Sequence, residues 1–317
     1  MSNNQNVAVI IAAYNADKTL ARAIESVIDD ECVAQVIVVD DCSTDTTMSI
    51  AKHYQNLHDK VSVYSTGTNS GPSKARNIAL QHCTSDWVTV LDSDDFIEAG
   101  RYQKLLANSG GYQLVADDQY KVIEGQPLST KTEMMGKSHH FPRDIRLSEF
   151  IVSNISKKGK ERQELGFIKP IIKRDFLIKN KLAYQENMRL GEDYELYCRC
   201  LALGAKLRLI EACGYVALVR ENSLSGNHSL HDLIQLRDCD YKMASSLPVT
   251  VEESQLLSQH AESINVKIQW IEFYTSLKNL KVASSLKALF NSFSALVYIT
   301  KQLKVEFVKR FIKRTAN

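Results

Sequence analysis

Apolar runs and helically spaced apolar residues alternate regularly along the first hundred residues. Runs of strand length alternate with helical segments, which in chain order cover residues 7–11, 17–30, 36–39, 44–54, 61–64, 71–80 and 87–91. Short buried strands separated by helices of this length need crossover connections, which build a parallel sheet with helices on both faces. The pattern therefore predicts an α/β fold for this part of the chain.

The pattern is looser from residue 111 onward. Val115 and residues 122–123 are expected to be edge strands, and the polar stretch 124–143 is expected to be a loop or a lid. Residues 167–172 are apolar but include Pro170, which cannot donate to a sheet ladder, so no central strand is expected there. The clearer elements of this part are two helices and two strands, expected at 147–153, 192–203, 207–210 and 215–219.

Residues 227–317 have helical spacing almost throughout, and Pro248 interrupts it. No internal repeat is visible along the chain. We therefore predict an α/β domain at 1–226, with halves 1–110 and 111–226, followed by a helical region at 227–317.

The composition fits a soluble globular protein with a sizeable core. Of 317 residues, 44% are hydrophobic and 24% are charged, which are ordinary values for such proteins. Seven scattered cysteines are typical of reduced intracellular thiols. The N-terminus is polar, unlike a secretory signal, and no apolar run reaches the roughly 18 residues of a membrane-spanning helix. We therefore expect a cytoplasmic protein without a nucleic-acid partner.

Acidic and polar residues follow three of the predicted strands. The first strand leads into residues 12–15, the second into Asp40 and Asp41, and the fourth into residues 92–95. Ligands of open parallel sheets bind beyond the carboxyl ends of the strands. Clustered carboxylates repel one another and raise one another's pKa. We therefore expect these acids to hold a cation or to accept hydrogen bonds from a ligand.

Asp92 and Asp94 form a DxD pair at the end of the fourth strand. Side chains alternate along extended backbone, so both would point to the same side. Their hard oxygen atoms suit Mg²⁺ or Mn²⁺ bridging a diphosphate. The alternative is that such acidic pairs are solvated turn and cap residues; two pairs at one sheet edge favour the binding site.

Four segments resemble the nucleotide-sugar-binding half of family 2 glycosyltransferases: VAVIIAAYNA, VIVVDDCSTDTT, NSGPSKARNIAL and WVTVLDSDDF. A second similarity begins at Gly191. The resemblance implies the GT-A fold, with a Rossmann-like, mostly parallel sheet, helices on both faces and a helical C-terminal region. It makes 1–226 the catalytic domain, with a nucleotide-sugar half at 1–110 and an acceptor half at 111–226.

The resemblance also implies a set of nucleotide-binding residues. Tyr14 would stack on uracil, Asp41 would accept from its ring N–H, Gly71 would let the backbone approach the nucleotide, and Arg76 would neutralise the diphosphate or orient the acids. Asp94 would bind the metal directly. The implied set is Ala12, Tyr14, Asn15, Asp41, Gly71, Arg76, Asp92, Ser93 and Asp94, with Asp92 facing the ribose or the metal.

Glu192 and Asp193 resemble the family's Glu-Asp motif at a helix start. A positioned carboxylate can accept the proton of an acceptor hydroxyl as it attacks the sugar. A single such base gives one displacement with inversion, by analogy with inverting glycosidases. We expect Asp193 to be the base and Glu192 to orient the acceptor or its loop. The alternative is that two acids in a first turn merely complement the helix dipole.

The resemblance therefore predicts a metal-dependent enzyme of bacterial exopolysaccharide, capsule or lipopolysaccharide synthesis. It would transfer a sugar from a UDP-sugar to a saccharide or lipid-linked saccharide. A nicotinamide enzyme is disfavoured because the first strand lacks GxGxxG. The remaining alternatives are an aspartate-nucleophile phosphohydrolase, disfavoured because Phe96 replaces the expected small residue, and a non-catalytic nucleotide-sugar-binding protein.

Other polar residues have open roles. His228 is either a metal or diphosphate ligand or, as we prefer, a surface histidine at a helix start. A basic group could supply a diphosphate contact but is expected to be mostly a solvated loop: Lys157, Lys158, Lys160, Arg162 and Lys169.

The C-terminal stretch 285–314 combines apolar residues with a basic face. Residues 301–317 carry six Lys or Arg side chains and a single acid, Glu306. Such a helix can lie on an anionic membrane, here the inner face of the plasma membrane. It can equally pack on the catalytic domain or form a homodimer, and the sequence leaves these alternatives open.

Overall fold

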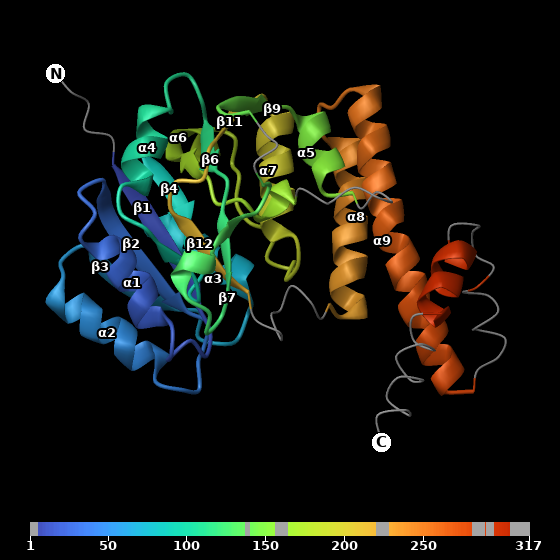
Figure 1. Ribbon diagram of the computed structural model, residues 1–317, viewed down its shortest axis with the longest axis horizontal. Helices are drawn as coiled ribbons and strands as arrows, with labels where there is room; N and C mark the ends of the chain where they lie inside the picture. The colour runs from blue at the N-terminus through green and yellow to red at the C-terminus, as the bar shows by residue number, and fades with distance from the viewer. Residues whose placement is uncertain are drawn as a thin grey trace.

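The computed structural model describes residues 6–136, 140–155, 164–219, 228–280, 289 and 295–304 (Figure 1). A large mixed sheet lies at its centre, which confirms the α/β fold. Its strand order is β3 (Val61–Ser65), β2 (Val33–Asp40), β1 (Val7–Ala13), β4 (Trp87–Val90), β10 (Ile171–Lys173), β6 (Leu114–Asp117), β11 (Leu207–Ile210) and β9 (Arg143–Ile145).

The parallel part of this sheet is built from the N-terminal crossover units. β3, β2, β1 and β4 are parallel neighbours. The helices between them are α1 (Leu20–Ile28), α2 (Thr47–Leu57) and α3 (Pro72–His82), and α4 (Arg101–Ala107) follows.

Strand β1 shows why helices cover both faces of the sheet. Its residues are almost all buried, and side chains alternate between two hydrophobic clusters. Ile10 packs in the cluster that contains Ala75 of α3, whereas Ile11 packs in the cluster that contains Ile24 of α1. The apolar run at 7–11 therefore serves two cores at once.

The strands expected at 207–210 and 215–219 are confirmed, but the other strands beyond residue 111 differ from their predictions. Val115 lies in β6, between β10 and β11, so it is not on an edge. β10 is a central strand, antiparallel to both β4 and β6. The prediction against a central strand failed because Pro170 immediately precedes β10 and withholds no N–H from the ladder.

A second, smaller sheet has the order β5 (Phe96–Ile97), β12 (Tyr215–Val219), β7 (Tyr120–Ile123) and β8 (Thr132–Glu133). Residues 122–123 lie in β7, between β12 and β8, so the expected edge position is wrong here too. Much of the following polar stretch is loop, as expected, with one turn of 3₁₀ helix, η1 (Leu128–Thr130).

In the described residues between β9 and α8, the helical segments are α5 (Leu147–Ser153), η2 (Leu165–Phe167), α6 (Arg174–Lys179) and α7 (Glu192–Ala202). The predicted helices at 147–153 and 192–203 are thus confirmed to within a residue.

The C-terminal region is helical, as predicted. α8 (Leu230–Ser246) and α9 (Val251–Lys278) are separated at Pro248 and lie beside α5 and α7, at the end of the sheet away from β3 (Figure 1). Leu257 of α9 belongs to the same cluster as Ile10 of the sheet. The helices therefore share a core with the α/β part.

Two predictions fall mainly outside the described residues. The boundary at 226 lies there, as does most of the basic stretch 285–314. Of the latter, Ala295 and Ile299 pack with Phe273 of α9. Within the described ranges, no helix combines the length and apolar character that crossing a bilayer requires.

Candidate active site

The first part of the site lies where β1 and β2 end. Asn15 has a positive φ of 48°, and its Oδ1 accepts a hydrogen bond from the Thr44 N–H at 2.9 Å. Its own N–H donates to Ser43 Oγ at 2.9 Å. These bonds tie the loop after β1, the strand that contains Ala12, to the loop after β2. The neighbouring Tyr14 is 49% exposed, so its ring is accessible.

Asp41 is a buried acid held by neutral donors. Its Oδ1 accepts from Thr66 Oγ1 and from the Ser70 N–H, both at 2.8 Å. Its Oδ2 accepts from the Gly71 N–H at 2.7 Å. An ionised carboxylate has about four acceptor positions, so one remains on Oδ2.

The backbone conformation at the start of α3 requires a glycine at position 71. Its φ is 90°, a region that favours glycine. A Cβ there would lie 3.3 Å from Arg189 Nε, so the loop leaves little room for a side chain. This geometry brings the Gly71 N–H against Asp41.

Residues 92–95 form a turn, unlike the extended strand end that the sequence suggested. The Asp95 N–H donates to the Asp92 carbonyl at 3.0 Å, across Ser93 and Asp94. The alternation argument for a same-side pair at 92 and 94 is therefore wrong for this segment. The Asp94 carbonyl accepts from Arg22 Nη2 at 2.7 Å.

Asp95 anchors this turn to β12. Its carboxylate accepts from the Tyr215 hydroxyl at 2.8 Å and from the Leu218 N–H at 2.9 Å. Burial, together with the charges of Asp92 and Asp94, raises the pKa of Asp95 to about 7. Through these two hydrogen bonds to β12, Asp95 fixes the position of the turn.

Arg76 and Lys169 join the two halves of the site. Arg76 contacts Asp92 at 2.9 Å, Glu192 at 2.8 Å and Asp193 at 3.2 Å. Lys169 contacts Asp92 at 2.9 Å and Asp193 at 2.7 Å. Acids from two distant parts of the sequence, Asp92 and the adjacent Glu192 and Asp193, therefore converge on two buried cations.

These contacts set the charge states in the cluster. Burial opposes the charge of Asp92, but Lys169 and Arg76 outweigh it and lower the Asp92 pKa to about 2. For Glu192, burial dominates and raises the pKa despite Arg76. Burial also opposes the charge of Lys169, yet Asp193 and Asp92 raise its pKa overall.

Helix α7 presents Glu192 and Asp193 in its first turn. It follows Gly191, whose φ is 73°, and a Cβ at Gly191 would lie 2.6 Å from Leu236 Cδ1 of α8. Acids at a helix start are favoured by the helix dipole. Asp193 also accepts from the buried Tyr184 hydroxyl at 3.1 Å.

Two members of this cluster were missed by sequence reasoning. Lys169 was grouped with basic residues expected in a solvated loop, but it is buried. The available sequence signal for the burial of Lys169 was its position as a single charge between apolar residues and Pro170. Tyr184 had no such signal. The other basic residues of that group, at 157–162, lie outside the described residues.

No ready-made metal group of three or more His, Cys, Asp or Glu side chains occurs in the described portion of the chain.

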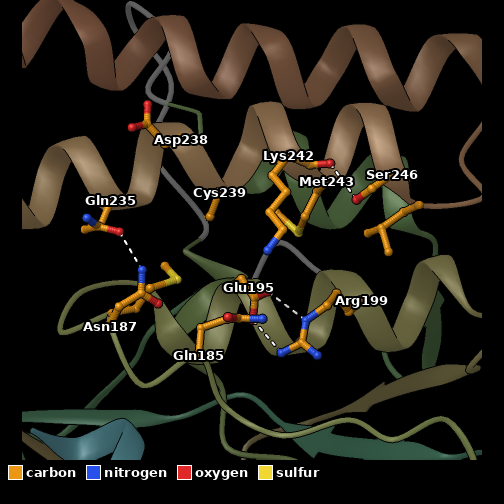
Figure 2. A pocket seen from close by; sticks show the side chains of 12 residues that line it. Gln185, Asn187, Glu195, Arg199, Gln235, Asp238, Cys239, Lys242, Met243 and Ser246 are labelled. Atoms are coloured by element: carbon orange, nitrogen blue, oxygen red, sulfur yellow. Dashed lines mark hydrogen bonds and ion pairs between the residues drawn. The ribbon is translucent and has the colours of Figure 1, made fainter.

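A separate pocket of about 160 Å³ lies between α7 and α8 (Figure 2). The Glu195–Arg199 pair lies on one side of it and Lys242 on the other. None of the converging acids lines it.

The fold is shared with a solved glycosyltransferase. The crystal structure of Staphylococcus aureus TarS residues 1–349 in complex with UDP-GlcNAc matches with a TM-score of 0.68 at 21% identity, over 90% of this chain and 80% of that one. GalNAc-T7 with UDP, GalNAc and Mn²⁺ matches with a TM-score of 0.57 at 18% identity, over 84% of this chain and 55% of that one.

Sequence comparison gives the family. The model of glycosyl transferase family 2 matches residues 8–170. The succinoglycan biosynthesis protein ExoU of Rhizobium meliloti (strain 1021) is 37% identical over 274 residues, which cover 86% of this chain and 79% of that protein. The chain belongs to glycosyl transferase family 2.

Proposed function

We propose that this chain is an inverting glycosyltransferase that moves a sugar from a UDP-sugar to a hydroxyl of a saccharide acceptor in bacterial polysaccharide synthesis. The observation that carries the proposal is the convergence of Asp92 and Asp193 on Arg76 and Lys169. The acceptor class rests on the similarity to ExoU. The acceptor is a free or lipid-linked saccharide.

The nucleotide is proposed to bind where β1 and β2 end. The exposed ring of Tyr14 suits stacking on uracil. The remaining acceptor position of Asp41 suits the uracil ring N–H. Ala12, Asn15 and Ser93 belong to the same edge, and the similarity to TarS with UDP-GlcNAc supports UDP as the nucleotide.

The residues present fit a divalent ion. Asp92 remains 33% exposed and lies in the same turn as Asp94. Asp92 and Asp94 would hold Mg²⁺ or Mn²⁺, for which their oxygen atoms are suitable ligands. The ion would offset negative charge on the departing diphosphate, and Mn²⁺ accompanies UDP in GalNAc-T7.

Asp193 is the proposed general base. It would accept the proton of the acceptor hydroxyl as that oxygen bonds to the anomeric carbon and UDP departs. Glu192, on the same helix turn, would orient the acceptor. Attack from the face opposite UDP inverts the anomeric configuration.

The test is to incubate the protein with a panel of UDP-sugars, saccharide acceptors and Mn²⁺, and to follow the products by NMR. We expect UDP and a glycoside of inverted anomeric configuration. A glycoside of retained configuration would contradict the single displacement. Release of inorganic phosphate without a glycoside would favour the phosphohydrolase.

A further inference from the structure

Lys169 is a buried cation inserted between the two halves of the site. Its side chain is 7% exposed, and it comes from the segment between η2 and β10, far in sequence from both acids that it contacts. Burying an ammonium group is costly unless it is paired. The burial of Lys169 therefore needs compensating ion pairs.

The two cations and two acids form a closed ring of alternating charge. Arg76 contacts Oδ1 of Asp92 and Oδ1 of Asp193. Lys169 contacts the other oxygen, Oδ2, of each. Each carboxylate thus has one oxygen on each cation, so the separation and orientation of the two acids are fixed from both sides.

The backbone around Lys169 is held just as firmly. Arg101 Nη2 donates to the Lys169 carbonyl at 2.5 Å, and Arg101 is itself paired with Asp117 at 2.8 Å. Both partners of that pair are fully buried. Gln119 Nε2 donates to the Phe167 carbonyl at 2.8 Å. Hydrogen bonds to the Phe167 and Lys169 carbonyls therefore hold the backbone of this segment in place.

Pro170 and β10 complete this support. The proline ring fixes φ directly after Lys169, and the central strand β10 begins one residue later. Arg101, Asp117 and Gln119 lie on elements other than α3 and α7, which carry Arg76 and Asp193. The support therefore directs Lys169 independently of its ionic partners.

We propose that Lys169 is a positioning residue, which holds the general base Asp193 in register with the donor-side acid Asp92. The proposal rests on the function proposed above. Without the lysine, Arg76 alone would face three acids, and the repulsion between Asp92 and Asp193 would separate them. A misplacement of about 1 Å can lower a rate about 100-fold.

The test compares Lys169→Met with Lys169→Arg and with the matched control Lys173→Met, whose exposed side chain ends β10. We expect Lys169→Met to lower kcat about 100-fold, with the affinity for UDP changed less than about threefold. Lys169→Arg should restore kcat to within about tenfold of wild type, and Lys173→Met should match wild type.

Two kinetic outcomes would overturn the proposal. An unchanged kcat in Lys169→Met would remove any role in catalysis. A loss of UDP affinity in step with kcat would make Lys169 a diphosphate-binding residue. Melting temperatures of all variants, measured together, separate these outcomes from loss of folded protein.

Crystal structures of Lys169→Met and Lys173→Met give a readout independent of turnover. We expect the Asp193 carboxylate to move by about 1 Å relative to Asp92 in the first variant only. An unmoved carboxylate would contradict the positioning role, even if the wild-type protein transferred no sugar. Inactivity of the wild type with every donor would instead count against the proposed function.

Discussion

Asp41 and Asp193 are both buried acids of the site, but they are held in opposite ways. Asp41 accepts from a hydroxyl and two backbone N–H groups, all supplied by residues 66–71. Asp193 accepts from two cations and a tyrosine hydroxyl, supplied by three separate segments of the chain. Neutral donors from a single loop suit an acid at a fixed binding position. Cations from several elements suit an acid that must be aligned with chemistry elsewhere.

Among the substitutions that test this comparison, Asp193→Asn should have the largest effect on kcat. A general base contributes about 10²–10⁴-fold to a rate, so we expect kcat to fall by that range while UDP affinity stays within about threefold. Steady-state kinetics and UDP titration measure the two quantities.

The matched control is Asp175→Asn, which removes an exposed acid from the first turn of α6. It should leave kcat unchanged. If Asp193→Asn kept most of its turnover, the acid would only complement the dipole of α7.

Asp118 is a second buried acid that accepts hydrogen bonds from neutral donors. It accepts from the Gln119 and Met135 N–H groups, and burial raises its pKa to about 6, whereas two cations lower that of Asp92 to about 2. Between about pH 4 and 6 the folded state then holds a proton that the unfolded state has lost. The contribution of Asp118 to the free energy of unfolding should therefore fall as pH rises through this window, by up to about 3 kcal/mol.

Urea unfolding at several pH values measures this dependence. In Asp118→Asn the side chain no longer titrates, so the decrease between pH 4 and 6 should be smaller than in wild type. Identical slopes in the two proteins would show that Asp118 does not hold its proton in the folded state.

The contrast between contacts from one loop and contacts from several segments also explains how much of the structure the sequence could predict. The first four strands follow from local crossover units, and β1, β2 and β4 are buried almost throughout. β6 and β10 were misplaced because their neighbours in the sheet come from distant parts of the chain. Their short apolar runs carry no information about pairing partners.

The site divides in the same way. Asp41 and two of its donors, Ser70 and Gly71, lie in two of the segments that resemble the family, so the sequence pattern could indicate them. Lys169 lies between η2 and β10 and Tyr184 between α6 and α7, outside those segments, so only the tertiary structure shows that they contact Asp193. The turn at 92–95 was also missed, because the tertiary bonds of Asp95 to β12 set its geometry.

The central claim is that one sheet edge binds the nucleotide through Asp41 and performs chemistry through Asp193. The most direct test is calorimetric titration of UDP with Mn²⁺ into wild type, Asp41→Asn and Asp193→Asn. In Asp41→Asn an amide NH₂ would face backbone N–H donors, and a lost hydrogen bond to a charged group costs about 1.5–3 kcal/mol. We predict that UDP binds wild type, binds Asp193→Asn about equally, and binds Asp41→Asn about 10- to 100-fold more weakly. Equal affinity in Asp41→Asn, or no binding to wild type, would contradict the account.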